Sequence, residues 1–293
     1  MFWRWDFPTG SNSALDEPRI ADSRRHGAGG LRGAAGNLAA FLLNTVIPGE
    51  CNWCKGAIRH ARRIPYCDEC LALPQPLHAE HYCSRCRNPF QNDATLDARG
   101  VCLRCRSGLP GFDYVYSFGF FDGVLRSMVH DLKYSRVSPL GGYLGELMAR
   151  AIPLDLAVDA IVPVPIHWTR WINRGYNQAE LLARPLARRL QIPILSPLRR
   201  KRTTKSQVSL TVSERRKNLA GAFSIRDRSL VADKRVLLVD DVLTTGATIG
   251  YCSRLLRDAG ARSVTVVTLA RVDRRPSPAR VVLTASQASG GTS

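Results

Sequence analysis

Four C-x-x-C pairs within residues 51–105 limit what this chain can fold into more than any other feature of its sequence. The two thiolates of such a pair can bind one metal ion, and a second pair on a neighbouring hairpin completes a tetrahedral zinc site with Zn–S distances of about 2.3 Å. The spacers within the two sets of four are short, at 12 and 15 residues. The pairs predict two structural Zn²⁺ ions in a double zinc ribbon, the first bound by Cys51, Cys54, Cys67 and Cys70 and the second by Cys83, Cys86, Cys102 and Cys105.

An iron–sulfur cluster and redox-active dithiols are the alternatives for these cysteines. The two-plus-two arrangement and the short chain between pairs favour zinc over both. Segments this short build little hydrophobic core, so metal binding would supply their folding energy. The ninth cysteine, Cys252, stands alone in the sequence, and we expect it to be a small core residue.

Composition divides the chain into four parts. Residues 1–35 are rich in Gly, Ser, Arg and Ala and predict a disordered N-terminal extension. Residues 36–110 hold a short helix, at 36–48, and the double zinc ribbon. Residues 111–272 form the large domain, and residues 273–293 predict a disordered tail. No apolar run is long enough to span a bilayer, and the first residues lack the order of a signal peptide, so we expect a cytoplasmic protein.

Strand and helix patterns alternate through residues 111–272, which predicts an α/β fold with a mainly parallel sheet and flanking helices. Strands are expected at 114–120, 160–162, 235–239 and 263–269. Helices are expected at 124–132, 140–148, 179–190 and 249–259, with a kink at Pro185 in the third of them.

The chain is strongly basic, with 42 Lys and Arg against 24 Asp and Glu and a formal net charge of +18. Such a charge favours polyanionic partners, either nucleic acid or small phosphorylated molecules. A genome of high GC content that uses arginine freely would also produce part of this excess. The net charge therefore favours a polyanionic partner but does not distinguish nucleic acid from a small phosphorylated molecule.

The stretch after the apolar strand at 235–239 carries the most specific chemistry. The strand ends in Asp240 and Asp241, and a loop of Thr, Gly and small residues then leads into a helix. Loops at the carboxyl ends of parallel strands bind ligands, and N–H groups at a helix start can hold a phosphate. Two acidic side chains repel a phosphate bound beside them, so we expect them to have a separate role, such as accepting hydrogen bonds from sugar hydroxyls.

Three other interpretations fit this stretch less well. A receiver domain also has paired aspartates after a strand, but too few residues follow Asp241 to complete that fold. A Walker loop requires Gly-Lys-Thr or Gly-Lys-Ser, which is absent here. The third alternative is a helix that is merely capped after a strand.

The same stretch resembles the phosphoribosyl-pyrophosphate (PRPP) signature of type I phosphoribosyltransferases, and with the preceding ribbons the chain resembles the ComF family over residues 36–272. The resemblance implies that Asp240 and Asp241 hold the ribose hydroxyls and that the following loop wraps the 5′-phosphate. The PRPP-binding residues it implies are Asp240, Asp241, Val242, Leu243, Thr244, Thr245, Gly246, Ala247 and Thr248, with Pro163, Val164 and Pro165.

Further segments are similar to that family. Lys133 lies in its H-x-L-K-Y segment, and Arg174 lies in an R-R-G-[FY]-N-Q element whose first Arg is replaced here by Asn173. The resemblance gives catalytic roles to Lys133 and Arg174 along with the two aspartates. It also implies a mobile loop within the basic stretch 196–217 and just beyond it, carrying Gln207, Arg215 and Asn218.

The family implies Mg²⁺-bound PRPP as the ligand and displacement of its pyrophosphate by a nucleophile, with the ribbons in place of the variable hood that selects the acceptor. It also implies an association with DNA uptake during competence, and with the proteins of that process. Two alternatives stay open at this point. One is a non-catalytic protein that binds PRPP or a nucleotide together with single-stranded DNA. The other is a transcriptional regulator that senses PRPP. The sequence leaves the acceptor and the oligomeric state open.

Overall fold

The computed structural model describes residues 49–58, 63–90, 92–107, 111–201 and 221–273. The chain divides into two compact units, residues 1–47 and 48–293, and all the described residues belong to the second. The predicted helix at 36–48, the N-terminal extension, the tail beyond Asp273 and the mobile-loop residues Gln207, Arg215 and Asn218 lie outside the described residues.

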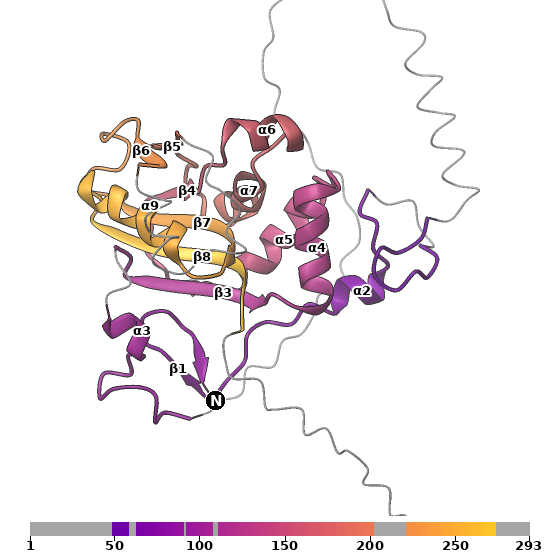
Figure 1. Ribbon diagram of the computed structural model, residues 1–293, viewed down its shortest axis with the longest axis horizontal. Helices are drawn as coiled ribbons and strands as arrows, with labels where there is room; N and C mark the ends of the chain where they lie inside the picture. Colours follow the sequence, from indigo (N-terminus) through magenta and orange to yellow (C-terminus); the bar gives the residue numbers. More distant parts are fainter. Residues whose placement is uncertain (1–48, 59–62, 91, 108–110, 202–220, 274–293) are drawn as a thin grey trace, which may run out of the picture. The chain divides into compact units, whose positions relative to one another are not determined.

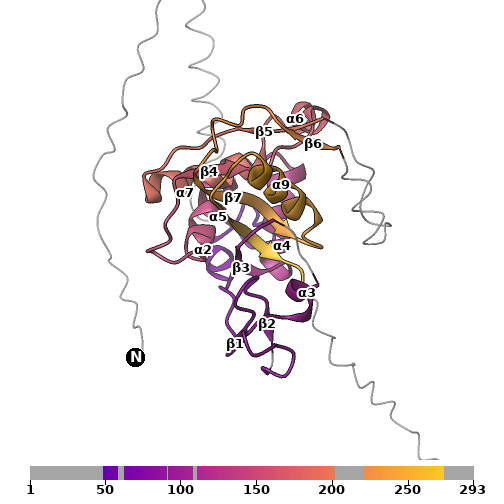
Figure 2. The same cartoon turned by 90° about the vertical axis from the view of Figure 1, so that its left-hand side faces the viewer.

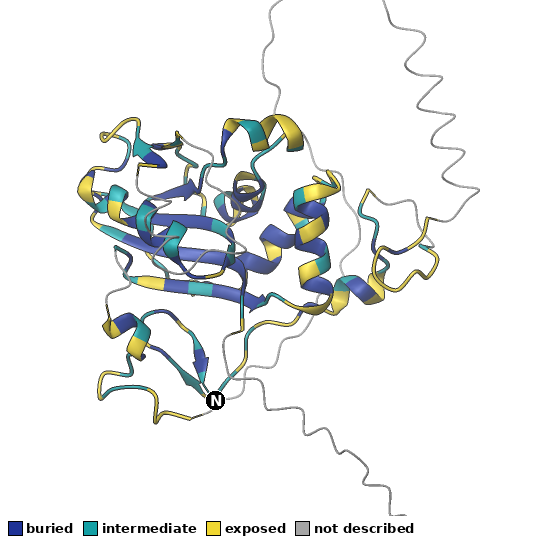
Figure 3. Cartoon of the chain, viewed as in Figure 1, coloured by how far each residue is buried: buried dark blue, intermediate teal, exposed yellow. Residues whose placement is uncertain are grey.

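A four-stranded parallel sheet forms the centre of this unit (Figure 1). Its strands are β3 (Tyr114–Phe120), β8 (Ser263–Arg271), β7 (Arg235–Leu243) and β4 (Ala160–Pro163), in that spatial order. The two central strands are rich in Val and Leu and are buried along most of their length (Figure 3), as expected for strands covered on both faces. The parallel α/β sheet predicted from the sequence is confirmed.

Five helices of the described residues accompany the sheet: α4 (Gly123–Tyr134), α5 (Leu140–Ala149), α6 (Trp168–Arg174), α7 (Gln178–Leu190) and α9 (Ala247–Asp258). Buried residues of α4, α5 and α7 share one hydrophobic core with the sheet, and those of α9 belong to a second. Helix α7 continues through Pro185 as a single helix. Helix α6 was not predicted from the sequence. It is only seven residues long, and its apolar residues Trp168, Trp171 and Ile172 are exposed and belong to no core.

The described part of the cysteine-rich segment contains short elements: α2 (Asp68–Ala72), β1 (His81–Tyr82), β2 (Pro89–Phe90) and α3 (Leu103–Arg106). In both views, β1 and α3 lie beyond β3, on the opposite side of the sheet from α6 and the antiparallel pair β5 (Leu198–Arg200) and β6 (Phe223–Ile225) (Figure 2). Strand β5 lies near the start of the basic stretch 196–217, and the residues predicted to carry the mobile loop lie outside the described residues.

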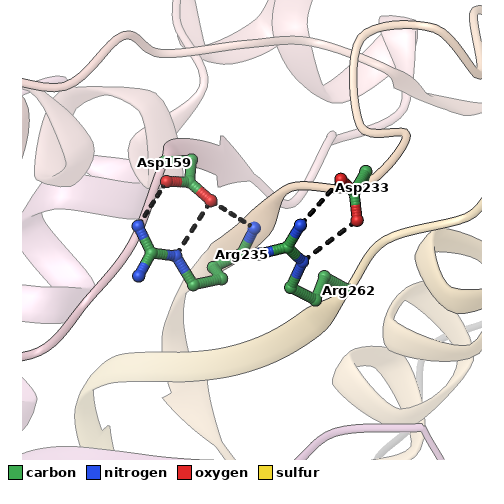
Figure 4. Close-up of polar contacts among 4 residues, drawn as sticks. All are labelled: Asp159, Asp233, Arg235 and Arg262. Atoms are coloured by element: carbon green, nitrogen blue, oxygen red, sulfur yellow. Dashed lines mark hydrogen bonds and ion pairs between the residues drawn. The ribbon is translucent and has the colours of Figure 1, made fainter.

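Two ion pairs hold the amino-terminal ends of the central strands (Figure 4). Arg235, the first residue of β7, contacts Asp159 at 2.6 Å, and Arg262, just before β8, contacts Asp233 at 2.7 Å. The hydrogen bonds from Arg235 lower the pKa of Asp159 to about 2. These pairs therefore lie at the opposite end of β7 from Asp240 and Asp241. Within the described residues, no helix is long and apolar enough to cross a membrane.

Candidate functional site

The paired aspartates lie inside strand β7 and not after its end. Asp240 is in register with Thr268 of β8, and the ladder continues to Leu243, which is in register with Arg271. The prediction that the strand stops at residue 239 was therefore wrong, because the apolar residues after the acids still pair with β8. The true loop is only Thr244–Gly246, and α9 begins at Ala247, two residues before the predicted start.

A pocket of about 300 Å³ opens around these acids. Two acidic and four cationic side chains line it, which leaves the lining with an excess of positive charge. The remaining lining residues come from α4, from the segment after β4, from α7, from β7 and the loop after it, and from the start of α9. The lining residues that carry charge are Asp240, Asp241, Lys133, Arg170, Arg174 and Arg200.

Asp241 is held from two sides by residues far away in the sequence. Lys133, near the end of α4, donates from Nζ to Asp241 Oδ1 at 2.7 Å. Gln178, the first residue of α7, donates from Nε2 to Oδ2 at 2.8 Å. Arg174 in turn donates to Gln178 Oε1 at 2.9 Å. Both oxygens of this buried carboxylate are thus already hydrogen-bonded, so the ion pair fixes its orientation before any ligand arrives.

Asp240 is in a different electrostatic state. Its Oδ1 accepts from the backbone N–H of Asp241 at 2.9 Å. Part of its surface faces the pocket, yet burial of the carboxyl, followed by repulsion from the adjacent Asp241, raises the pKa of Asp240 to about 7. A carboxyl poised in this way gains from any ligand that donates hydrogen bonds to its ionised form.

The predicted loop residues divide between two sides of the chain. Val242, Thr244 and Thr248 line the charged pocket, together with Val164 and Pro165 from the predicted segment after β4. Pro163 lies within β4 itself. Leu243, Thr245 and Gly246 instead line a second, mostly apolar cavity of about 590 Å³ between the loop and the second cysteine cluster. Ala247 begins α9, and its N–H donates to the Thr245 side chain at 3.3 Å.

Five lining residues of the pocket were not assigned from the sequence, and three of them, Gln178, Arg200 and Arg170, carry an amide or a positive charge. Gln178 belongs to the same R-R-G-[FY]-N-Q element as Arg174, but nothing in that element indicates that the side-chain amide of Gln178 donates to Asp241. Arg200 was one cation in a basic stretch. Arg170 belongs to α6, which itself was missed. The general rule that ligands bind at the carboxyl ends of parallel strands could have identified these residues, because their segments converge there.

The eight paired cysteines form two groups, each with its sulfur atoms within 4.8 Å of one another. Four thiolates at this separation are the donor set of a structural zinc site, so the residues fit the predicted metal. The second group is wholly buried, whereas the first has an exposed member, Cys54. Cys252 is fully buried in the core that includes α9, as predicted.

A curated relative, competence protein F of Haemophilus influenzae, is 32% identical over 231 residues, which cover 76% of this chain and 96% of that protein. The chain belongs to the ComF family. The DNA utilization protein YhgH of Escherichia coli K12 is 32% identical over 221 residues, covering 69% of this chain and 96% of the relative. The ComF resemblance stated from the sequence is thereby confirmed.

The phosphoribosyl transferase domain family matches residues 177–284 of this ComF chain, a range that begins at the start of α7 and includes β7, α9 and β8. Among solved structures, a purine phosphoribosyltransferase from Pyrococcus horikoshii Ot3 is 20% identical, with 49% of this chain and 80% of that chain covered at a TM-score of 0.27. The domain match and the parallel sheet establish a phosphoribosyltransferase-type fold for the ComF chain, preceded by cysteine groups consistent with a zinc ribbon.

Proposed function

We propose that this chain binds PRPP with Mg²⁺ in the pocket around Asp240 and Asp241, and transfers the phosphoribosyl group to a nucleophile. The observation that carries the proposal is the composition of that pocket, where two adjacent carboxylates meet four cationic side chains. Carboxylates suit the two neighbouring ribose hydroxyls, which are hydrogen-bond donors. Cations suit a sugar that carries both a phosphate and a pyrophosphate.

The loop after β7, Thr244–Gly246, would bind the 5′-phosphate together with the start of α9, and we call it the phosphate loop. Thr244 and Thr248 line the charged pocket on either side of the turn, and α9 starts between them. The first N–H groups of a helix have no partner within the helix and attract anions. Gly246 adopts a φ of 76°, a left-handed conformation that lets the chain turn sharply from strand into helix.

In the proposed reaction, a lone pair of the nucleophile forms a bond to ribose C1 while the C1–O bond to pyrophosphate breaks. The pyrophosphate leaves with the electron pair of the broken C1–O bond. The proposed nucleophile is a nitrogen of an acceptor still to be identified, and this nitrogen releases a proton to solvent once the new bond has formed. Mg²⁺ would be held by pyrophosphate oxygens and would neutralise their charge as they leave. This fits a pocket in which both oxygens of Asp241 are already occupied by Lys133 and Gln178.

The side chains then have distinct roles. Asp240 and Asp241 orient the ribose, and Lys133 holds the carboxylate of Asp241 in place. Arg174 holds Gln178, which holds Asp241 from the other side. Arg170, beside the segment that ends in Pro165, stabilises the pyrophosphate. The protein contributes mainly by positioning the sugar and stabilising charge.

The test is release of pyrophosphate from PRPP and Mg²⁺ in the presence of a panel of bases and amines. The proposal expects release with at least one acceptor, and its loss when Mg²⁺ is left out of the reaction or when Asp240 is changed to Asn. Binding of PRPP without release for any acceptor would reduce the function to ligand binding. Absence of PRPP binding would end the proposal.

A second candidate is a protein that binds PRPP or a nucleotide without turnover and also binds single-stranded DNA. It is favoured by α6, where Trp168 and Trp171 are exposed beside Arg170 on a chain of net charge +18. Aromatic rings next to cations stack unpaired bases, and such binding weakens steeply with salt. The names of the two relatives, competence protein F and DNA utilization protein, agree with a role in DNA uptake for this chain.

Point variants test the DNA candidate better than removal of the ribbons, because Cys51, Tyr66 and Cys70 belong to the main hydrophobic core. Single-stranded oligonucleotide binding should weaken in Trp168→Ala/Trp171→Ala while PRPP binding is unchanged. Equal DNA affinity in this variant and the wild type would exclude α6 as the contact surface.

A further inference from the structure

Each cysteine group places a side chain from inside one of its C-x-x-C turns onto an element of the charged pocket. In the first group, Asn52 lies between Cys51 and Cys54, and its Nδ2 donates to Asp131 Oδ2 at 2.6 Å. In the second group, Arg104 lies between Cys102 and Cys105, and its guanidinium donates to the backbone carbonyl of Thr245. The two contacts reach different halves of the pocket.

The first contact is reinforced from the other C-x-x-C turn of the same group. Tyr66, the residue before Cys67, is fully buried and donates to the same Asp131 oxygen at 2.9 Å. Ser135 donates to the second oxygen of Asp131 at 3.0 Å. Asp131 lies on α4, two residues before Lys133, the partner of Asp241. A buried carboxylate with these donors fixes the helix that carries Lys133.

The second contact is also doubled. Arg271 is the last residue of β8 and is in register with Leu243, the residue before the phosphate loop. Its guanidinium donates to the carbonyl of Cys86, a member of the second group, at 3.0 Å. The turn that holds Cys102 and Cys105 thus contacts Thr245 directly, and the turn that holds Cys86 contacts Arg271, the strand partner of Leu243.

We propose that Asn52 and Arg104 are positioning residues through which the two cysteine groups hold the two halves of the ligand pocket. The first group, through Asn52 and Asp131, sets the position of Lys133. The second group, through Arg104, sets the position of the phosphate loop. The cysteine groups are then part of the binding apparatus as well as of the fold. The effect on ligand affinity rests on the proposed PRPP function, whereas the effect on the two protein segments does not.

The experiment uses full-length zinc-loaded protein with Asn52→Leu and Arg104→Met. The matched controls are Lys55→Met, an exposed residue whose amino group donates to the carbonyl of Asn52, and Arg106→Met, an exposed change on the same helix as Arg104. Zinc content is measured for every protein. PRPP affinity is measured by calorimetry, and amide hydrogen exchange is followed in residues 123–134 and 243–248.

The proposal expects both variants to keep two zinc ions and to bind PRPP about three- to tenfold more weakly than their controls. Exchange should quicken in 123–134 for Asn52→Leu only and in 243–248 for Arg104→Met only. Arg104→Lys, which keeps a cationic donor, should recover part of the affinity. The two losses should add in the double variant, because the two contacts share no residue.

Asp131→Asn provides a second variant that leaves the cysteine turns untouched, and it should reproduce the effect of Asn52→Leu even where that variant loses metal. Affinities and exchange equal to those of the controls, with zinc retained, would overturn the proposal. Wild-type protein that binds no PRPP would overturn the proposed function alone, since the exchange measurements still decide whether the two segments are positioned by the cysteine turns.

Discussion

Replacing Lys133 with Met should destabilise the protein strongly, because it removes the cation from a buried ion pair. The side chains of Lys133 and Asp241 are only 19% and 8% exposed, and their charged atoms lie 2.7 Å apart. Met keeps the length of the apolar stem. Asp241 would then keep only the neutral amide of Gln178, and a buried charge left in this way costs about 3–5 kcal/mol of folding free energy.

The reverse change should cost much less. Asp241→Asn keeps the size of the side chain and removes the repulsion with Asp240, while Lys133 can turn its amino group toward water in the open pocket. We expect a loss of about 1 kcal/mol for this variant, in the range of an ordinary hydrogen bond. The double variant should be close to Asp241→Asn alone, because no unpaired charge remains.

Urea unfolding followed by circular dichroism, with zinc at saturation, gives the three free energies of unfolding. The asymmetry between the two single variants is the informative result. A Lys133→Met protein within about 0.5 kcal/mol of the wild type, the range of ordinary surface changes, would show that the ion pair does not form in the free protein.

The cysteine groups, Asp240 and Asp159 each lead to a further prediction. Elemental analysis should find two zinc ions per chain, unchanged in Cys252→Ser, and a chelator should remove zinc first from the group with exposed Cys54; an iron–sulfur absorption spectrum would contradict this. Because the pKa of Asp240 is raised to about 7, its carboxyl contributes stability below about pH 4 that is lost as the pH rises through about 7. In thermal melts, the stability of the free protein relative to Asp240→Asn should therefore fall over that range. Profiles of melting temperature against pH that run parallel for the two proteins would refute this. The lowered pKa of Asp159 contributes stability above about pH 4 that is lost as pH falls through about 2, so Asp159→Asn should cost at most about 1 kcal/mol at neutral pH and nothing near pH 2.

Local sequence patterns were enough to predict the two cysteine groups and the strands of the sheet. Cysteine spacing gave both thiolate groups, and the apolar runs gave all four strands of the sheet within a few residues. The end of β7 was missed because two adjacent acids usually mark a strand's end. Val242 and Leu243 continue the ladder here, and only the pairing with β8 reveals it.

The site depended on contacts that no local pattern encodes. Lys133 and Gln178 meet Asp241 across 108 and 63 positions of the chain. Their side chains converge because the end of α4, the start of α7 and the carboxyl-terminal part of β7 lie at the same pocket. Family resemblance selected Lys133 as a candidate, but the partner of its amino group follows from the fold alone.

Calorimetric titration with PRPP and Mg²⁺ of the wild type and Asp240→Asn tests the central claim most directly. Asp240 is the better choice of the two acids because its side chain does not share the Lys133 ion pair. Asp258→Asn, an exposed change at the far end of α9, is the control. The account predicts measurable binding by the wild type and the control, and binding about ten- to a hundredfold weaker for Asp240→Asn, the cost of one charged hydrogen bond. Wild-type protein without binding at millimolar PRPP, or equal affinities for all three proteins, would contradict it.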